Sequence, residues 1–386
     1  MKAIVLAYHN IGCASIEALL RNGFEIPAVF THKDNSVENI WFDSVAELAA
    51  SQDITVFAPD NINHPIWVRK IRQLKPDILF SFYYRNMVGP SILEIPPAGG
   101  LNLHGSFLPR YRGRCPINWV LVNGERETGV TLHYMTPQPD DGDVVCQRKI
   151  TITDDDTAKT LHEKAVKTSS RMLDEILPLI KEGNAPHKPQ DHSKSTYFGG
   201  RRPEDGEIDW KITATEVRDL VRAVAHPYPG AFSYVGDRKC MLWKVTEVSL
   251  HNLATPGNIS STDPLVIACG KGAIRVDFGQ PEGGVYMSGT QLAQELGLAK
   301  GMSFGPRAGS LAEAETKKRI LILGVDGFIG NALSERLLES GKYEVHGMDL
   351  QSNSIERLMD RPGFYFDEGD ISIHREWIEY HIRKCD

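Results

Sequence analysis

Residues 101–119 read LNLHGSFLPRYRGRCPINW, and this run opens as an apolar strand that carries an amide and an imidazole two positions apart, Asn102 and His104. Asp140 follows within GVTLHYMTPQPDDGDVV, residues 129–145. Acyl transfer to an amine needs these three groups, because the amide stabilises the oxyanion, the imidazole moves the proton and the carboxylate orients the imidazole. An isolated Asn-x-His is more often a core histidine beside a turn asparagine, so the surrounding pattern has to decide.

Around this run, strands and helices alternate over about the first 190 residues. Near-continuous apolar strands separated by helices predict an α/β fold with a doubly wound, mostly parallel sheet covered on both faces. Ligands bind beyond the carboxyl ends of such strands, which is where Asn102 and His104 lie. The predicted strands are Ala3–Tyr8, Ile26–Thr31, Thr55–Ala58, Ile78–Phe82, Leu101–His104 and Gly129–Tyr134. The predicted helices are Ser15–Asn22, after a turn at Gly12, then Ser44–Gln52, Pro65–Leu74 and Thr157–Glu182.

The wider pattern resembles the folate-dependent formyltransferases, whose signature joins Asn-x-His, Ser-x-Leu-Pro, Arg-Gly and Asp-x-Gly-Asp. The matching residues are Asn102/His104, Ser106/Leu108/Pro109, Arg112/Gly113 and Asp140/Gly142/Asp143, with Phe107 where leucine is usual. The resemblance implies that Asn102, His104 and Asp140 are catalytic and that 10-formyltetrahydrofolate is the co-substrate. Asp141 is then expected to be a solvated neighbour of the catalytic carboxylate.

The same resemblance implies a folate pocket built from two short segments and one arginine. Its residues are Asn86, Met87 and Val88, then Thr136, Pro137, Gln138, Pro139 and Asp140, and finally Arg114. Arg114 is placed where folate and a sugar nucleotide meet, and the alternative is a surface residue that caps a helix.

The texture of the chain changes after the polar stretch 183–200. A helix over Ala214–Ala225 precedes short strands, spaced by Gly, Pro and Asp-Arg turns, as far as about Phe278. This region resembles the small β-barrel-like (OB-like) carboxyl-terminal domain of the formyltransferases, whose Ile-Asp-Trp and Pro-x-Pro-Gly-Ala-Phe signatures stand at 208–210 and 227–232. The predicted domains are therefore residues 1–200 and 201–300, followed by a linker at 301–317 that is rich in Gly, Ala and Ser.

A second constellation predicts a dinucleotide-binding Rossmann half at 318–386. Gly324, Gly327 and Gly330 separate a strand from a helix, and Asp349 ends the next strand. Glycines let a pyrophosphate approach the backbone, and the carboxylate binds ribose hydroxyls. The predicted elements are strands at Arg319–Leu323, Glu344–Met348 and Phe364–Phe366 and a helix at Asn331–Ser340.

The glycine spacing resembles the extended short-chain dehydrogenases, which implies NAD contacts at the three glycines and Asp349, and at Asp370 and Ile371. That family's catalytic Tyr-x-x-x-Lys lies beyond a fourth strand and would fall later than Asp386, and the string at 380–384 precedes that strand, so we treat it as chance. We expect a truncated half without redox activity, with NAD a cofactor of the intact parent enzyme.

A formyltransferase joined to such a unit resembles the bifunctional enzymes of Gram-negative bacteria that formylate UDP-4-amino-4-deoxy-L-arabinose and oxidatively decarboxylate UDP-glucuronic acid. This implies a UDP-amino sugar as partner and no nucleic acid. Methionyl-tRNA formyltransferase is an alternative, but residues 32–48 lack its basic insertion, and the formal charge of −7 disfavours a phosphate backbone as partner. A formyltetrahydrofolate hydrolase and a non-catalytic scaffold are further alternatives.

The composition bounds the remaining classes. Six cysteines form no Cys-x-x-Cys pair, so neither a metal site nor a disulfide framework is expected. No run of 18 apolar residues occurs, and we expect a cytoplasmic protein without a membrane span. The intact parent is expected to be an oligomer, and the sequence leaves open whether this chain is one.

Overall fold

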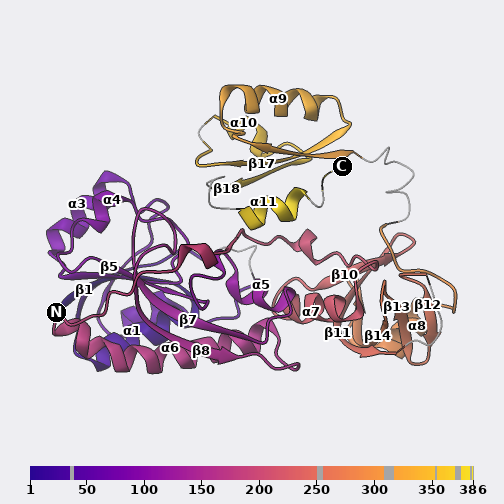
Figure 1. Ribbon diagram of the computed structural model, residues 1–386, viewed down its shortest axis with the longest axis horizontal. Coiled ribbons are helices and arrows are strands. Elements are labelled where there is room, and N and C mark those ends of the chain that lie inside the picture. Colours follow the sequence, from indigo (N-terminus) through magenta and orange to yellow (C-terminus); the bar gives the residue numbers. More distant parts are fainter. Residues whose placement is uncertain are drawn as a thin grey trace. The chain divides into compact units, whose positions relative to one another are not determined.

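The computed structural model describes residues 1–34, 39–249, 255–307, 317–352, 354–369, 375–382 and 385. The chain forms two compact units, Met1–Val120 with Glu125–Ser195, and Leu121–Gly124 with Thr196–Asp386 (Figure 1). No helix in the described ranges combines the length and the apolar character that crossing a bilayer requires.

The first unit is built on one sheet of seven strands. In order across the sheet these are β3 (Thr55–Phe57), β2 (Glu25–Phe30), β1 (Lys2–Ala7), β4 (Ile78–Phe82), β5 (Gly100–His104), β7 (Glu127–Tyr134) and β8 (Val144–Thr151). The first five are parallel, and β7 and β8 are antiparallel to their neighbours. The predicted α/β class with a mostly parallel sheet is confirmed. Strand β8 was not predicted, because its outer half, Gln147–Lys149, is exposed or half-buried and breaks the apolar run.

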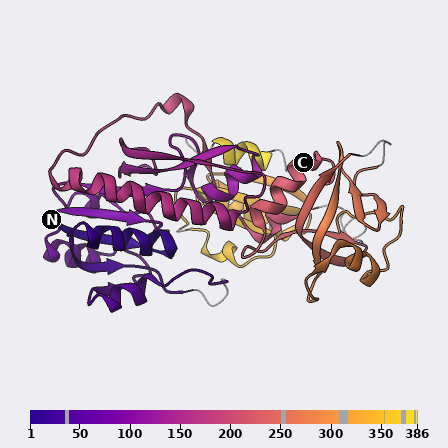
Figure 2. The same cartoon turned by 90° about the horizontal axis from the view of Figure 1, so that it is seen from below.

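Helices cover both faces of this sheet, which explains why β1 and β4 are almost completely buried and mostly apolar. On one face α1 (His9–Arg21) and α6 (Ala158–Lys181) lie side by side, joined by the Arg21–Asp174 ion pair (Figure 2). On the other face Ile71 of α3 (Pro65–Leu74) and Ile92 of α4 (Pro90–Leu93) pack against β1. The remaining short elements of the unit are α2 (Val45–Ser51), β6 (Arg112–Gly113), α5 (Pro116–Val122) and a 3₁₀ turn at His192–Lys194.

The turn predicted at Gly12 is wrong, because α1 begins at His9 and includes Gly12. A Cβ at Gly12 would lie 3.0 Å from Val45 Cγ2 and 3.1 Å from Ala7 Cβ. Gly12 therefore allows α1 to pack closely against Ala7 and Val45, and it does not form a turn. The chain instead reverses at His9, whose φ of 66° lies in the left-handed region that L residues rarely adopt.

The second unit contains an antiparallel sheet in the order β10 (Ala231–Val235), β11 (Arg238–Val248), β14 (Ala273–Pro281), β13 (Leu265–Ala268) and β12 (Ile259–Thr262), with β15 (Met287–Ser288) on β14. Helix α7 (Ala214–Val224) packs on β11, and α8 (Gly289–Glu295) packs on β14. Strand β9 (Tyr197–Phe198) and a 3₁₀ turn at Pro203–Gly206 precede them. The pairings run along an open path, and the OB-like barrel stays a prediction.

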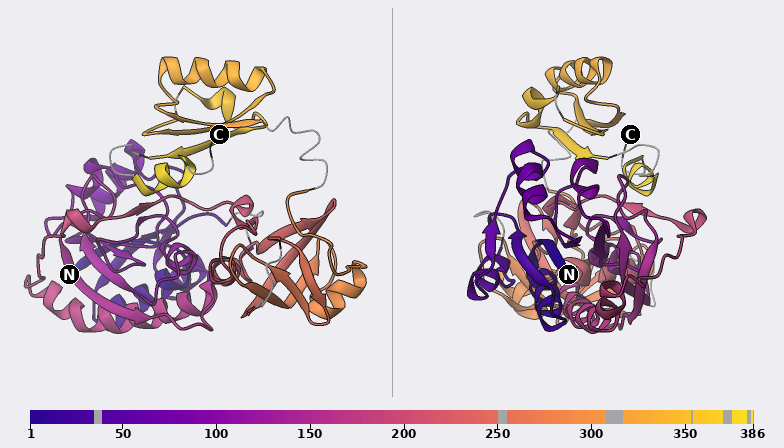
Figure 3. Two further views of the ribbon diagram at one scale, coloured as in Figure 1. Left: turned by 45° about the vertical axis from the view of Figure 1, so that its right-hand side comes forward. Right: turned by 90° about the vertical axis from the view of Figure 1, so that its left-hand side faces the viewer.

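A third sheet of parallel strands follows in the order β16 (Lys318–Leu323), β17 (Tyr343–Asp349) and β18 (Phe364–Glu368). Helix α9 (Phe328–Glu339) covers one face and α11 (Arg375–Ile382) lies on the other, while α10 (Glu356–Met359) precedes β18 (Figure 3). The three predicted strands are confirmed. Part of the predicted linker, residues 308–316, lies outside the described residues.

Candidate active site

Two antiparallel strands bring the predicted catalytic trio together. Asn102 and His104 end β5, where Asn102 pairs with His133 of β7 and His104 pairs with Thr131. The segment after β7 turns back, so that Asp140 Oδ1 lies 3.4 Å from His104 Nδ1 and accepts a 3.3 Å hydrogen bond from Asn102 Nδ2. The structure therefore places the three groups, 38 residues apart in sequence, in mutual contact.

His104 is held from both sides of its ring. Its Nε2 lies 2.7 Å from the carbonyl oxygen of Tyr111, so this nitrogen carries a hydrogen and donates it. Its Nδ1 faces the Asp140 carboxylate, and the side chain is only 8% exposed. An imidazole protonated on both nitrogens satisfies both acceptors at once, which suits a group that stabilises and then donates to a developing negative charge.

Asp140 is an ionised carboxylate in a buried position. Burial alone raises the pKa of Asp140, but the positive charge of His104, the hydrogen bond and charge of His133 and the backbone N–H of Gly113 together hold that pKa well below its usual range. The Gly113 N–H donates to Oδ2 at 2.9 Å. These contacts favour the ionised form of the carboxylate.

His133 is a site residue that the sequence alone did not single out. Its Nε2 lies 3.1 Å from Asn102 Nδ2 and 3.4 Å from Asp140 Oδ1, and its Nδ1 is fixed by the carbonyl of Tyr134 at 2.8 Å. The side chain is 2% exposed. Its position opposite Asn102 follows only from the strand register, although a histidine inside the apolar run before Asp140 was a signal that could have been used.

The expectation that Asp141 is a solvated neighbour is wrong. Its side chain is 24% exposed and forms an ion pair with Arg112, a residue that is buried almost completely. Gln190 completes the network, because its oxygen accepts from Arg112 at 2.7 Å and its amide donates to the carbonyls of Asp140 at 2.9 Å and Gly142 at 2.7 Å. A buried guanidinium needs such partners, and this requirement fixes the turn that carries Asp140.

The two predicted folate segments follow the ends of β4 and β7. Val88 and Met135 belong to the same apolar cluster, so the segments 86–88 and 136–140 leave one common core. Met87 is half-exposed, and its carbonyl accepts a 2.9 Å hydrogen bond from Asn63. Asn86 donates to Asp60 O at 3.3 Å and Thr136 to Gln138 O at 2.9 Å, and Pro137 and Gln138 are exposed while Pro139 is half-buried.

Arg114 is exposed and directly follows Gly113, the residue whose N–H binds Asp140. Backbone strain also gathers at this edge of the sheet. Of the seven non-glycine residues with positive φ in the described ranges, five belong to it, namely His9, Tyr83, Tyr111, Cys115 and Asp140. Such strain persists where the surrounding packing imposes it, and it is commonest at functional sites.

The glycine turn of the third sheet has the geometry that its spacing predicts. Gly324 has a φ of 79°, and a Cβ at Gly330 would lie 2.2 Å from the carbonyl oxygen of Gly324. Asp349 ends β17, and its carboxylate accepts hydrogen bonds from the backbone of Asp326 and Leu350, both at 2.8 Å. A Cβ at Gly327 would lie 3.3 Å from the same Gly324 oxygen. The predicted contacts Asp370 and Ile371, like Lys384, lie outside the described residues.

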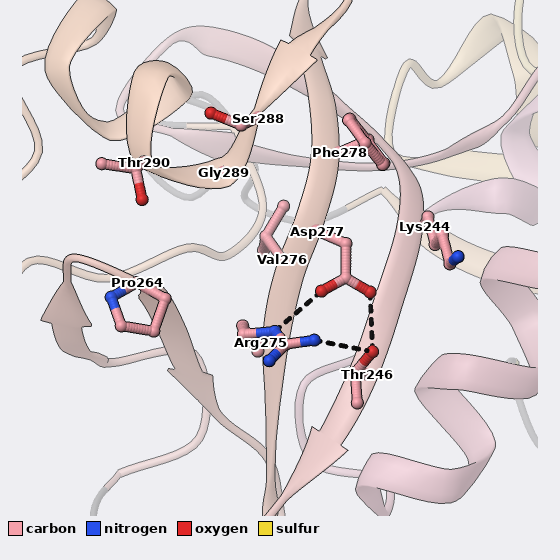
Figure 4. A pocket seen from close by; sticks show the side chains of 10 residues that line it. All are labelled: Lys244, Thr246, Pro264, Arg275, Val276, Asp277, Phe278, Ser288, Gly289 and Thr290. Atoms are coloured by element: carbon pink, nitrogen blue, oxygen red, sulfur yellow. Dashed lines mark hydrogen bonds and ion pairs between the residues drawn. The ribbon is translucent and has the colours of Figure 1, made fainter.

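A hollow of about 510 Å³ lies in the second unit, lined by residues of β11, β14, β15 and the start of α8 (Figure 4). Two of its charged side chains form an ion pair, because Asp277 accepts from Arg275 at 2.7 Å, and Asp277 also accepts from Thr246 at 2.6 Å. No residue singled out from the sequence lines it. The residues predicted to carry the chemistry therefore lie at the edge of the first sheet and not in this hollow.

Residues 1–177 match the family described as formyl transferase, and residues 201–297 match the formyl transferase C-terminal domain. These matches indicate a folate-dependent formyltransferase. Residues 320–386 match the NAD dependent epimerase/dehydratase family. The chain thus fits a bifunctional arrangement, in which a formyltransferase is joined to a Rossmann-like epimerase fragment.

Solved structures share this fold. An N-formyltransferase from Helicobacter canadensis, in complex with folinic acid and dTDP-3-aminofucose, has a TM-score of 0.59 and 22% identity over 72% of this chain and 98% of its own. The sugar 3N-formyl transferase WlaRD, with dTDP and 5-N-formyl-THF, has a TM-score of 0.55 and 22% identity over 71% of this chain and 96% of its own. HypX from Aquifex aeolicus, with tetrahydrofolic acid, has a TM-score of 0.53 and 16% identity over 90% of this chain and 59% of its own.

Proposed function

We propose that the chain transfers the formyl group of 10-formyltetrahydrofolate to the 4-amino group of UDP-4-amino-4-deoxy-L-arabinose, a step of lipid A modification that leads to polymyxin resistance. Two formyl transferase matches and an epimerase/dehydratase match on one chain support this proposal. The neighbours solved with a folate and a dTDP-amino sugar support the pairing of substrates. The bifunctional polymyxin-resistance enzymes join these same two kinds of domain.

The reaction assigns a step to each member of the trio. The neutral sugar amine attacks the formyl carbon, a C–N bond forms, and the carbonyl electrons move onto oxygen. The Asn102 amide and the protonated His104 donate to this oxyanion. The bond to N10 of the folate then breaks, N10 takes the proton of His104, and the proton lost by the amine restores the imidazolium. The products are the formamide and tetrahydrofolate.

The observation that carries this proposal is the convergence of three side chains on one oxygen, Oδ1 of Asp140. Asn102 Nδ2, His104 Nδ1 and His133 Nε2 all lie within 3.4 Å of it. Since His104 Nε2 is bound to Tyr111 O, Nδ1 is the nitrogen that shares a space with the Asn102 amide. Asn102 Nδ2 and His104 Nδ1 meet at Oδ1 of Asp140, and the oxyanion is therefore assigned to the space beside this oxygen, next to both nitrogens.

The folate is assigned to the segments 86–88 and 136–140, with Arg114 between folate and sugar nucleotide. Exposed backbone and half-exposed Met87 suit a flat pterin ring. The glycine turn of the third sheet fits the ADP half of NAD, because Gly324 makes the tight turn with a positive φ and Gly330 lets the following helix pack closely against it.

One competition experiment tests the acceptor. Purified protein is offered radiolabelled formyl folate, the UDP-amino sugar and charged initiator tRNA together. We expect label in the sugar nucleotide. Label in the tRNA would instead indicate a methionyl-tRNA formyltransferase, and formate released without either acceptor would indicate a hydrolase.

A further inference from the structure

A cavity of about 190 Å³ lies at the carboxyl edge of the first sheet, between the start of α1 and the first turns of α6. Its lining includes Asn10, Trp41, Lys159, His162 and Lys167. The α6 residues among them are spaced so that they share one face of the helix. None of the predicted folate residues or catalytic residues lines this cavity.

The cavity lies at the point where the strand order of the sheet reverses. From β1 the chain proceeds through β2 to β3 on one side, and then crosses to β4 on the other. Doubly wound sheets bind their ligands at this switch point. His9 follows β1 and Tyr83 follows β4, and the ring of His162 lies 4.4 Å from that of His9 and 5.8 Å from that of Tyr83.

Tyr83 also connects the cavity to the reaction centre. A Cβ at Gly105, the residue after His104, would lie 2.6 Å from the Tyr83 hydroxyl oxygen. One tyrosine side chain therefore separates the end of the catalytic strand from His162.

The inner wall of the cavity suits a flat, uncharged heterocycle. Trp41 offers an aromatic ring, and His162 packs edge-on to it at 5.3 Å. His162 is 3% exposed, and its Nε2 has no hydrogen-bond partner within the described part of the chain. Burial lowers the pKa of His162 to about 4, so the ring is neutral near pH 7. Asn10 is held by Asp43 through two 3.2 Å hydrogen bonds, and its carboxamide retains further donor and acceptor capacity.

The mouth of the cavity suits an anion. Lys159 and Lys167 are exposed, and within the described ranges neither forms an ion pair. Glu163 lies between them on the same face and carries one opposing charge. Two mobile ammonium groups flanking a groove bind phosphate oxygens as point charges.

We propose that this cavity binds the nucleoside diphosphate end of the acceptor, with the base against Trp41 and His162 and the diphosphate at Lys159 and Lys167. This inference rests on the proposed function, which makes the acceptor a nucleotide sugar. With the base in the cavity, the sugar lies along Tyr83 and presents its amine to His104.

The test uses UDP as a probe of the complete 386-residue chain, by isothermal titration calorimetry. Trp41→Ala should weaken UDP binding by about tenfold or more, as loss of a base-stacking ring does, while Trp41→Phe should retain most of the affinity. Lys159→Ala combined with Lys167→Ala should weaken UDP binding by a similar factor at low salt, and less at high salt. Arg171→Ala removes an exposed cation of the same helix outside the cavity and should change nothing.

Steady-state kinetics separates this inference from the proposed function. The KM for the UDP-amino sugar should rise in the Trp41→Ala and double-lysine variants, and the KM for the folate should not. Unchanged UDP affinity in both variants, with formyl transfer to the sugar nucleotide intact, would overturn the cavity assignment and leave the proposed function standing. UDP binding that depends on Trp41, in a protein that formylates no sugar nucleotide, would support the cavity assignment and refute the proposed function.

Discussion

In two parallel sheets of the chain, the first strand leads directly into a helix, after β1 in one and after β16 in the other. The two junctions differ in what they present at the edge of the sheet. After β1 the chain continues into His9 and Asn10, and side chains that follow several strands line this edge of the first sheet. After β16 it continues into Gly324, Gly327 and Gly330, and the edge is nearly bare backbone. The same local topology can therefore present either positioned side chains for chemistry or open N–H groups for a pyrophosphate.

The two edges also differ in how they tolerate an unusual backbone. Gly324 adopts a positive φ without cost, because it has no Cβ. His9 adopts a φ of 66° with its side chain stacked on Phe42 at 4.0 Å and packed against Trp41 at 4.7 Å. The positive φ is thus maintained by side-chain packing at the edge after β1, and it is allowed by the missing Cβ of glycine at the edge after β16.

Removal of the charge at Asp140 should have the largest effect. Asp140→Asn keeps the shape but loses the carboxylate on which three side chains converge, so turnover should fall by about 10²–10³, as when an oxyanion-stabilising group is lost. A formyl-transfer assay measures this loss. Asp349→Asn makes the matched change at the end of β17 and should leave formyl transfer within about twofold. Equal losses in both variants would erase the distinction between the edges.

Acid should destabilise the first edge through His162. The pKa of this ring is about 4 when folded, against 6.5 for the free side chain, and burial is the cause. As the pH falls from 6.5 to 4 the unfolded chain gains a proton that the folded chain refuses, so the free energy of unfolding falls by about 3 kcal/mol. Urea unfolding followed by tryptophan fluorescence at pH 4 to 8 measures this. His162→Phe should reduce the slope over that window, and the remaining slope is expected from His9, whose pKa is also lowered by burial. An unchanged slope would contradict the burial argument.

His133→Ala should reduce turnover by about 10–100-fold, since a hydrogen bond to a charged group contributes about 1.5–3 kcal/mol. His133 positions Asp140 and Asn102, so the loss should fall on kcat while the KM for folate stays near the wild-type value. His187→Ala removes an exposed imidazole that stacks on Tyr134 and makes no contact with Asp140 among the described residues, and it should leave kcat unchanged. A loss confined to KM would assign His133 to folate binding.

Arg114→Ala should weaken binding of folate or of the UDP-amino sugar by about tenfold, because a guanidinium placed between two anionic ligands makes charge-assisted hydrogen bonds. Affinities measured separately for each ligand decide which contact is made. If both affinities equal those of the wild type, Arg114 is an exposed side chain without a role in either site.

The smallest effect on formyl transfer should come from the second edge. Gly330→Ala places a Cβ 2.2 Å from Gly324 O, which should destabilise the third sheet by about 1–3 kcal/mol through overpacking. Formyl transfer should stay within about twofold of the wild type. A tenfold loss of transfer would mean that the two edges are coupled.

Much of the first edge was predictable from sequence, because its signals are local. Continuous apolar runs such as Ile78–Phe82 predict buried parallel strands, and all six predicted strands of this sheet are present. Helix α6 is bounded within one residue of its prediction, since Thr157 forms a capping box with Thr160. Asn102, His104 and Asp140 were singled out because they belong to a sequence motif, and a motif can be identified without knowledge of the fold.

Only the tertiary structure decided the remaining features, since they depend on contacts between residues far apart in the chain. The register of β5 against β7 places His133 beside Asn102, and a buried guanidinium 78 residues from Gln190 fixes the turn at Asp140. The cavity at Trp41 and His162 exists because α6 returns to the edge where β1 ends. Side-chain periodicity reports which face a residue takes, but the partner on that face is set by packing, and packing is known only once the chain has folded.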